Sequence, residues 1–362
     1  MKRKNNIYIK LLKKANHTVF GVGENGQKLY YDPVHRKKVP YSSGQQVKRC
    51  IIDSLVDNLE VDRAEAIMNF SFEGKKIEQK EITELCDPSY PDQLIAGWML
   101  AASKKEKRND DDGEILKRRS PLSISAMTPL HPNLASYYSE TVTHDRSQEY
   151  NDEMVLRKGD KEEWRNDEIE NFLQEKNKSI SKNKWIGYET RANGLFTVDM
   201  AIELEKLFTV PIKLFDKEVS KKTEDKLRND GWESVMIKNI EHLQLPPEKI
   251  YEYSDAIAQS LINWLIKSNQ SRTYSPMPVI SIAISDASFK PSYAIKADKV
   301  RVDGNISARL TIDENVRGVN LYTTPIANEY FFGGEITTNP NAIEDAKEYI
   351  EKEIINYYQN SK

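Results

Sequence analysis

The sequence predicts an α+β fold, and three observations along the chain support this prediction. Ile7, Ile9 and Leu11 alternate with polar residues, which is the period of a β-strand. A helical pattern starts after Ser43, and strand character returns in the stretch 118–127. A long polar excursion follows, and then the order strand, helix, strand occurs a second time. This is the order of a modified ferredoxin-like or RRM fold that carries large insertions.

The first helix has the clearest start in the sequence. Ser43 is the predicted N-cap, and Gln46 three residues later completes a capping-box pattern. Apolar residues then recur near helical spacing at Val47, Cys50, Ile51, Leu55 and Leu59.

The second half of the chain repeats this order with longer elements. The segment GLFTVDMAIELEKLF alternates as a strand, and Tyr251 to Lys267 has the apolar stripe of an amphipathic helix. Val279 to Ile284 predicts a buried strand, and Asn341 to Tyr358 predicts a final helix.

Two stretches between these elements lack such periodicity. The segment from Val61 to Asp112 predicts irregular structure, with a short helix near Leu94 to Ala102 and a charged, flexible tract after it. The segment from Tyr137 to Arg191 is polar and aromatic, so we expect an excursion from the core.

Composition excludes several classes of protein. The 362 residues are 38% hydrophobic and 30% charged, which is typical of a soluble globular protein with a polar surface. Cys50 and Cys86 lack the paired spacing of a zinc site or a disulfide framework. Apolar runs such as Pro278 to Ile284 are too short to cross a bilayer, and the basic N-terminus lacks the features of a signal peptide. We expect a cytoplasmic protein without metal, cofactor or membrane contact.

The net charge of −3 hides an uneven distribution. Basic residues gather in Lys2 to Lys14, in Arg36 to Arg49 and at Arg118–Arg119, whereas acidic residues gather in Asp110 to Asp112 and Asp160 to Glu170. This asymmetry permits one basic face on a nearly neutral body. The alternative is that these charge runs are solvated surface.

The start of the first helix combines several features that suit a phosphate. Helix starts expose unpaired N–H groups and the positive end of the helix dipole. Gly44 permits close approach of the backbone, and serine hydroxyls and basic side chains surround it in the sequence HRKKVPYSSGQQVKR. The alternative interpretation is a capped helix with a solvated basic end.

This combination of segments resembles a known family. KKANHTVFGVG, VPYSSGQQVKR opening a helix, RRSPLSISAMTPLHP, and later GLFTVDMAIELEKLF and NQSRTYSPMP are similar to the DevR-type backbone subunits of CRISPR Cascade effector complexes. These belong to the RAMP superfamily of CRISPR-associated proteins. The resemblance extends from near the N-terminus to about residue 300, and the Ser-Ser-Gly-Gln helix start is its most specific part. The Asp110 tract, the stretch Tyr150 to Lys184 and the C-terminal helix are not matched.

The resemblance implies an RRM-like palm with finger and thumb insertions. It places the first half of the palm, with the RNA-binding helix start, in residues 1–60, a finger-like insertion in 61–117 and a palm strand in 118–130. A thumb-like insertion would occupy 131–191, the second half of the palm 192–300, and a C-terminal strand and helix extension 301–362. Several copies would polymerise along one guide RNA and present it for pairing.

The implied partners are a CRISPR guide RNA, copies of the chain itself, other Cascade subunits and, through the guide, a target nucleic acid. The RNA-binding residues come from the basic clusters, the helix start, and the loops that border the same groove or belong to the thumb. They are Asn16, His17, Lys28, Arg36, Lys37, Lys38, Ser42, Ser43, Gln45, Gln46, Lys48, Arg49, Arg118, Arg119, His144, Arg146, Asn269, Gln270 and Arg272.

The resemblance also raises the question of catalysis, because some members of the superfamily cut RNA. An aspartate between the first strand and first helix does this in some members, and here that loop offers Glu24 and Asp32. Asp32 lies in a Tyr-Asp-Pro turn, where a turn-capping role suffices. His17, His35 and His144 are candidates for acid–base chemistry but show no paired spacing. We expect a non-catalytic subunit; the alternatives are a RAMP-superfamily endoribonuclease and a scaffold without nucleic acid.

Overall fold

A computed structural model gives the structure of the chain. It describes residues 4–23, 26–74, 76–100, 116–143, 155–158, 161–165, 167–177, 185–212, 218–267, 274–302, 305–331 and 336–359.

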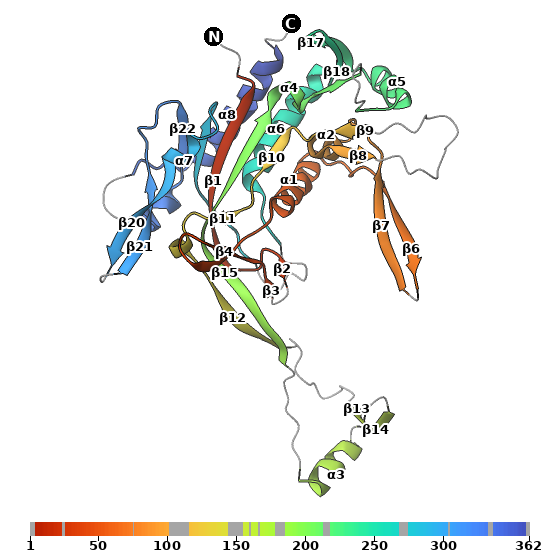
Figure 1. The fold of residues 1–362 in the computed structure, drawn as a ribbon, viewed down its shortest axis with the longest axis vertical. Coiled ribbons are helices and arrows are strands. Elements are labelled where there is room, and N and C mark those ends of the chain that lie inside the picture. Colours follow the sequence, from red (N-terminus) through yellow and green to blue (C-terminus); the bar gives the residue numbers. More distant parts are fainter. Residues whose placement is uncertain are drawn as a thin grey trace.

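A central antiparallel sheet organises the molecule (Figure 1). Its main strands lie in the order β10, β15, β1, β19, β22 and pair antiparallel throughout. Their bounds are Leu122–Ile124 (β10), Trp185–Glu203 (β15), Asn6–Thr18 (β1), Val279–Ser285 (β19) and Val319–Thr323 (β22). Helix α1 (Gly44–Asn58) lies between β1 and β10 along the chain, and α6 (Pro247–Asn263) lies between β15 and β19. The predicted α+β class and the order of its main elements are confirmed.

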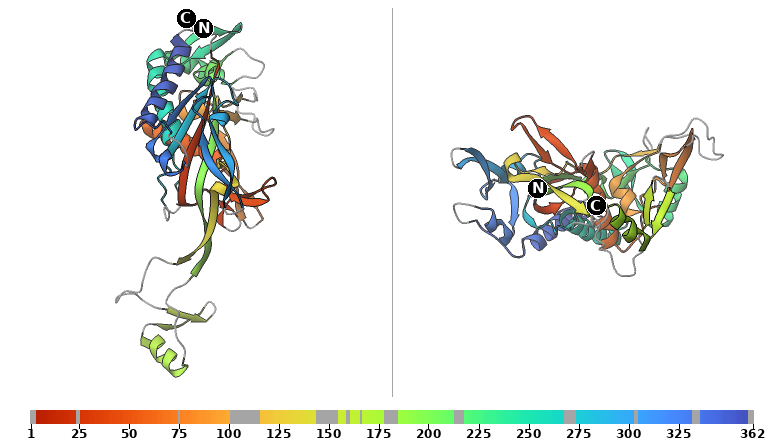
Figure 2. Two further views of the ribbon diagram at one scale, coloured as in Figure 1. Left: turned by 90° about the vertical axis from the view of Figure 1, so that its left-hand side faces the viewer. Right: turned by 90° about the horizontal axis from the view of Figure 1, so that it is seen from below.

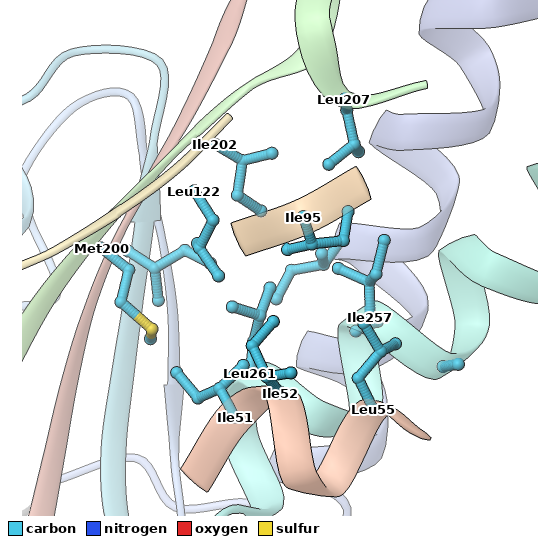
Figure 3. Close-up of a cluster of buried hydrophobic side chains, with 14 of the residues drawn as sticks. Ile51, Ile52, Leu55, Ile95, Leu122, Met200, Ile202, Leu207, Ile257 and Leu261 are labelled. Atoms are coloured by element: carbon cyan, nitrogen blue, oxygen red, sulfur yellow. The ribbon is translucent and has the colours of Figure 1, made fainter. Parts of the chain in front are cut away.

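The sheet is buried on both faces, and the side chains of β1 contribute to a hydrophobic cluster on each face. Leu11 and Leu12 are adjacent in this strand, so they point to opposite faces, and they belong to different clusters. On the first face, α1 and α6 pack together over the sheet (Figure 3), and α8 (Ala342–Gln359) covers α6. On the second face lie α7 (Pro291–Ala294) and the hairpin of β20 (Ile295–Val302) and β21 (Asn305–Ile312). Figure 2 shows the long helices along one side of the sheet.

The strongest local sequence patterns are confirmed. Ser43 is the N-cap of α1, and its Oγ accepts a hydrogen bond from the N–H of Gln46 at 3.3 Å. All residues of β19 are buried, as the continuous apolar run predicts. Helix α6 begins at Pro247, four residues before the predicted start, because proline suits the first helical turn.

The prediction of irregular structure is wrong for residues 61–100, and the predicted charged tract at 104–114 lies outside the described residues. This stretch contains a hairpin of β6 (Ala66–Glu73) and β7 (Lys76–Glu84), which projects from the body (Figure 1). The short helix predicted near Leu94 is α2, which spans Pro91–Ala96 and ends earlier than expected. It stops at Gly97, which has a φ of 76°, and β8 (Trp98–Leu100) pairs with β9 (Leu116–Arg118) beyond it.

The polar excursion is an extension of a core strand. Strand β12 (Ala135–Thr143) pairs with the first half of β15, and the two run out of the sheet as a long ribbon (Figure 1). Beyond it lie β13 (Val155–Lys158), β14 (Lys161–Arg165) and α3 (Asp167–Glu175). The division into palm, finger and thumb stays a prediction.

The remaining short elements lie outside the five main strands and the long helices. They are β2 (Val22–Gly23), β3 (Gly26–Gln27), β4 (Leu29–Asp32), β5 (Lys37–Pro40), β11 (Thr128–Pro129), η1 (Pro132–Leu134), α4 (Leu204–Leu207), β16 (Thr209–Pro211), α5 (Lys221–Asn229), β17 (Glu233–Ile237), β18 (Ile240–Gln244) and η2 (Pro325–Glu329). None of the helices in the described ranges is long and apolar enough to span a bilayer.

Candidate nucleic-acid interface

A groove of about 530 Å³ lies where β1, β12, β15 and β21 meet. Its basic side chains come from three distant segments, namely Lys14 of β1, Lys37 of β5 and Arg309 of β21. None of the described residues that line it carries a carboxylate. The groove therefore concentrates positive charge and favours an anionic ligand. We call it the basic groove; its lining residues are Lys14, Asn16, Lys37, Asn133, Leu134, Ala135, Ser136, Asn193, Gly194, Leu195, Ala308, Arg309, Leu310 and Tyr330.

Side chains in the basic groove combine charge with an aromatic surface and neutral donors. The ammonium of Lys14 lies 5.1 Å from the centre of the Tyr330 ring. The amides of Asn16, Asn133 and Asn193 can donate hydrogen bonds to phosphate or base oxygens. Proteins that bind single-stranded nucleic acid commonly combine basic residues with aromatic rings.

The wall of the basic groove depends on a glycine. Gly194 has a φ of 137°, which favours glycine over any other residue. A Cβ at this position would lie 2.3 Å from the carbonyl oxygen of Leu134 and 2.6 Å from Cα of Ala135. Its absence lets β15 pack directly against the turn that leads into β12.

The β4–β5 hairpin borders the basic groove and carries three predicted residues. Arg36 and Lys38 are exposed, and Arg36 occupies the left-handed region at the turn, with a φ of 50°. Lys37 points inward, and its Nζ donates to the carbonyl oxygens of Pro132 at 2.8 Å and Ala135 at 3.4 Å. Arg36 and Lys38 are thus the solvent-exposed charges of this hairpin, and Lys37 shapes the groove wall.

Asn16, His17 and Lys28 lie at the same end of the sheet. Asn16 is exposed and lines the basic groove. His17 is half-buried, and its ring contacts the hydroxyl of Tyr138 on the β12 strand. Lys28 is half-buried, with its aliphatic chain near Gly21. The structure therefore brings these three predicted residues together with the hairpin.

The start of α1 is less accessible to a ligand than the sequence predicts. Ser42 is fully buried, and its backbone exchanges hydrogen bonds with Met127. Its Oγ donates to Oε1 of Gln46 at 2.9 Å. A Cβ on Gly44 would lie 2.8 Å from the carbonyl oxygen of Ile124, so the helix start packs against this segment. A contact between Ser42 and RNA is excluded by its burial, Ser43 serves first as the helix N-cap, and the side chain of Gln46 is occupied by Ser42.

Lys48 has a structural role, and its predicted phosphate contact stays a prediction. Its Nζ donates to the carbonyl oxygen of Ala96 at 3.2 Å and to Oγ of Ser120 at 2.6 Å. It therefore caps the C-terminal end of α2, where a cation is favoured. Burial lowers the pKa of Lys48.

Arg118 is also inaccessible to RNA, because its side chain lies in the interior. Its side chain is fully buried, and Nη1 donates to Oε2 of Glu218 at 2.6 Å. Its Nε, Nη1 and Nη2 atoms also donate to the carbonyl oxygens of Leu94, Thr209 and Lys206, respectively. A guanidinium held this way cannot reach a phosphate, so the prediction that Arg118 binds RNA is wrong.

Other predicted residues lie on a second cleft or pair on the surface. Gln45 and Arg49 are exposed on a cleft of about 260 Å³ between α1 and α2, and Arg49 pairs with Asp53 at 3.3 Å. Arg119 is exposed and pairs with Glu203. This surface carries acidic as well as basic groups, so it is less suited to phosphate than the basic groove.

Five predicted residues lie outside the described residues: His144, Arg146, Asn269, Gln270 and Arg272.

Two histidines beside the basic groove form an enclosed pair. The rings of His35 and His131 lie 4.4 Å apart, and Nδ1 of His35 lies 3.2 Å from Oδ1 of Asp32. The Nε2 atoms of both rings are buried. Burial, helped by the charge of His35, lowers the pKa of His131. Neither Nε2 atom therefore reaches a ligand in the groove.

Several groove residues were missed from the sequence. Lys14 belongs to a recognised basic cluster, but nothing distinguished it there from Lys10 and Lys13. Arg309 and Tyr330 lie in the C-terminal part of the chain, and no local pattern connects them to Lys14. Only the packing of β21 and η2 against the sheet brings them to the groove.

Comparison with known proteins gives a structural likeness alone. No protein-family model matches the chain, and no curated protein matches it. Among solved structures, it is similar to a chain of a "CRISPR RNA-guided surveillance complex, pre-nicking", with a TM-score of 0.43 and 10% identity over 98% of this chain and 88% of that chain. It is also similar to a chain of a "CRISPR RNA-guided surveillance complex", with a TM-score of 0.37 and 11% identity over 98% of this chain and 83% of that chain.

Proposed function

We propose that this chain is a non-catalytic RNA-binding subunit of a Cascade-type CRISPR interference complex. It would hold the guide RNA through the basic groove and the β4–β5 hairpin and present the guide for pairing with a target. The observation that carries RNA binding is the groove, in which Lys14, Lys37 and Arg309 converge without a carboxylate among the described lining residues. The assignment to a CRISPR complex rests on the sequence segments that resemble DevR-type backbone subunits.

The groove suits contacts with the sugar-phosphate backbone of single-stranded RNA. Its cations and amides match phosphates and sugars, which carry no sequence information. Tyr330 offers a face on which any base can stack. A subunit that must hold guides of any sequence requires this kind of contact.

The absence of catalysis is part of the proposal. Among the described residues, no group of three or more His, Cys, Asp or Glu side chains is arranged to hold a metal ion. Two histidines beside the groove, His35 and His131, keep their Nε2 atoms buried. These observations favour a binding surface over an endoribonuclease site.

The first test removes positive charge from the basic groove and its hairpin. A Lys14→Gln/Lys38→Gln variant should bind a 30-nucleotide poly-uridine more weakly, by about tenfold near 0.1 M salt, because each lost phosphate contact also removes counterion release. The slope of log affinity against log salt should fall by about 0.7 for each lysine that contacts phosphate. Filter binding at several salt concentrations measures both quantities.

A matched control keeps the change in net charge the same. Lys222 and Lys249 are exposed on α5 and α6, away from the groove. The Lys222→Gln/Lys249→Gln variant should keep the wild-type affinity and salt slope. Equal losses of RNA affinity in the two variants, or no loss of affinity in the groove variant, would refute RNA binding by the basic groove.

The second test addresses catalysis. Wild-type chain incubated with excess precursor RNA and Mg²⁺ should leave the RNA intact on a denaturing gel. Cleavage that persists through further purification and disappears in a His17→Ala variant would contradict the non-catalytic proposal. That result would favour the alternative, an endoribonuclease of the RAMP superfamily.

A further inference from the structure

The β4–β5 hairpin is fastened to the turn before β12 at the edge of the basic groove. His35 of the hairpin lies against His131 of the turn, with the two rings edge to face and their centres 4.4 Å apart. Beside them, Nζ of Lys37 donates to the carbonyl oxygens of Pro132 and Ala135. Residues of both segments line the basic groove, so these contacts set the position of one of its walls. We call the pair of His35 and His131 the histidine latch.

The hydrogen bonds of the histidine latch fix which ring nitrogens carry a proton. The backbone N–H of Asn133 donates to Nδ1 of His131 at 3.1 Å, so this nitrogen is an acceptor and the ring is neutral. Nδ1 of His35 lies 3.2 Å from Oδ1 of Asp32 and donates to that carboxylate. His131 therefore keeps its single ring proton on Nε2, which is buried.

The closed latch has no place for a second proton on His131. This proton would go to Nδ1, where it would point at the N–H of Asn133 and break the hydrogen bond that caps the short helix η1. Among the described residues, the buried Nε2 atoms of His131 and His35 have no hydrogen-bond partner. A buried cation whose N–H groups lack acceptors is costly. Protonation of His131 is therefore incompatible with the closed arrangement.

The charged groups around His131 also oppose a positive ring. They come from the β4–β5 hairpin, β20 and β21, and they are Asp32, His35, Lys37, Lys299 and Arg309. Burial is the main reason that the pKa of His131 is lowered, and the positive charges of His35, Lys299 and Lys37 add to the effect. Asp32 acts in the opposite direction, but its carboxylate already accepts the hydrogen bond from His35. Positive groups thus outnumber negative ones around the turn.

We propose that the histidine latch holds the groove wall closed while His131 is neutral and releases the wall when His131 takes up a proton. Release breaks the cap of η1 and separates the two rings, and Lys37 then loses its acceptors Pro132 and Ala135. His131 is thus a positioning residue, which acts on the groove through the wall and contacts no ligand itself. The latch controls the groove for any anionic ligand, so it goes beyond the proposed function.

Hydrogen–deuterium exchange of the full-length chain, measured by mass spectrometry, reports opening of the wall. Labelling times are scaled for the intrinsic pH dependence of exchange. A released histidine has the ordinary pKa of about 6.5, so at about pH 5.5 its proton favours the open wall by up to about tenfold relative to about pH 7.5. Wild-type peptides from residues 31–40 and 128–136 should lose protection by this factor. Peptides from β19, in the buried sheet, should keep theirs.

Substitutions of His131 separate the proton from the hydrogen bond. The side-chain oxygen in His131→Asn can accept the same N–H of Asn133, because asparagine is a strong cap, but it does not titrate. This variant should keep its protection at both pH values. His131→Ser also caps without titrating, and it repeats the measurement if the first variant fails to fold. His242→Asn is the matched control, since His242 lies on β18 and does not line the groove, and it should behave as the wild type.

Two results of the exchange experiment would overturn the latch. Unchanged protection of the two wild-type segments would show that the wall stays closed, and an equal loss in wild type and His131→Asn would show that another group opens it. Circular dichroism verifies the folding of each variant. Poly-uridine binding at neutral pH should be the same in wild type and His131→Asn, because the wall is closed in both. Failure of both proteins to bind RNA would defeat only the proposed function, whereas unchanged exchange would defeat only the latch.

Discussion

The Arg118→Met variant is expected to lose about 3–5 kcal/mol of unfolding free energy, the range for breaking a buried ion pair from one side. Methionine fills much of the volume but donates no hydrogen bond. Glu218 would stay in the interior without its partner, which lies 2.6 Å away in the wild type. The carbonyl oxygens of Leu94, Thr209 and Lys206 would each lose a donor. Urea unfolding followed by circular dichroism measures the loss.

The neighbouring residue supplies the control. Arg119 has a side chain that is 62% exposed and pairs with Glu203 at the surface. Arg119→Met should therefore cost less than about 1 kcal/mol, as is usual for surface ion pairs. Adding Glu218→Met to Arg118→Met should recover part of the loss, because it removes the buried charge. Similar effects of Arg118→Met and Arg119→Met would contradict this account.

Arg118 also shows why part of the site was beyond prediction from sequence. The Ser43 cap was predictable because its partner, Gln46, is three residues away and the pattern is local. The partners of Arg118 lie between 24 and 100 residues away. A basic pair in the sequence does not reveal that one member turns inward and the other outward. Burial of this kind is decided by tertiary packing alone.

The basic groove contains residues that could not be predicted from the sequence. The order of the main elements followed from periodicity, because each buried strand or helix carries its own pattern. The groove instead needs Lys14, Ser136 and Arg309, which lie in three segments that become neighbours only after folding. Asn16 and Lys37 were predicted because they fall in basic or polar clusters near the N-terminus. Arg309 had no comparable local pattern.

Replacing Lys13 by methionine is expected to stabilise the protein at neutral pH. Lys13 is 3% exposed in the core, where its Nζ donates to the carbonyl oxygen of Trp264 at 2.7 Å and lies 4.6 Å from that ring. Burial lowers its pKa to about 7, whereas an unfolded lysine has a pKa of about 10.4. Methionine removes this desolvation cost but leaves the Trp264 carbonyl without its donor. We expect a net gain of about 2 kcal/mol at pH 7.

The pH dependence of this gain provides the decisive measurement. Between about pH 7 and pH 10 the unfolded chain keeps the Lys13 proton and the folded chain does not, so wild-type stability should rise with pH. The linkage slope is about 1.4 kcal/mol per pH unit. Lys13→Met lacks this titration, so the advantage of the variant should shrink as the pH rises and reverse above about pH 8.5. Parallel stability curves across this range would show that the buried ammonium keeps its proton, held by the Trp264 carbonyl and ring.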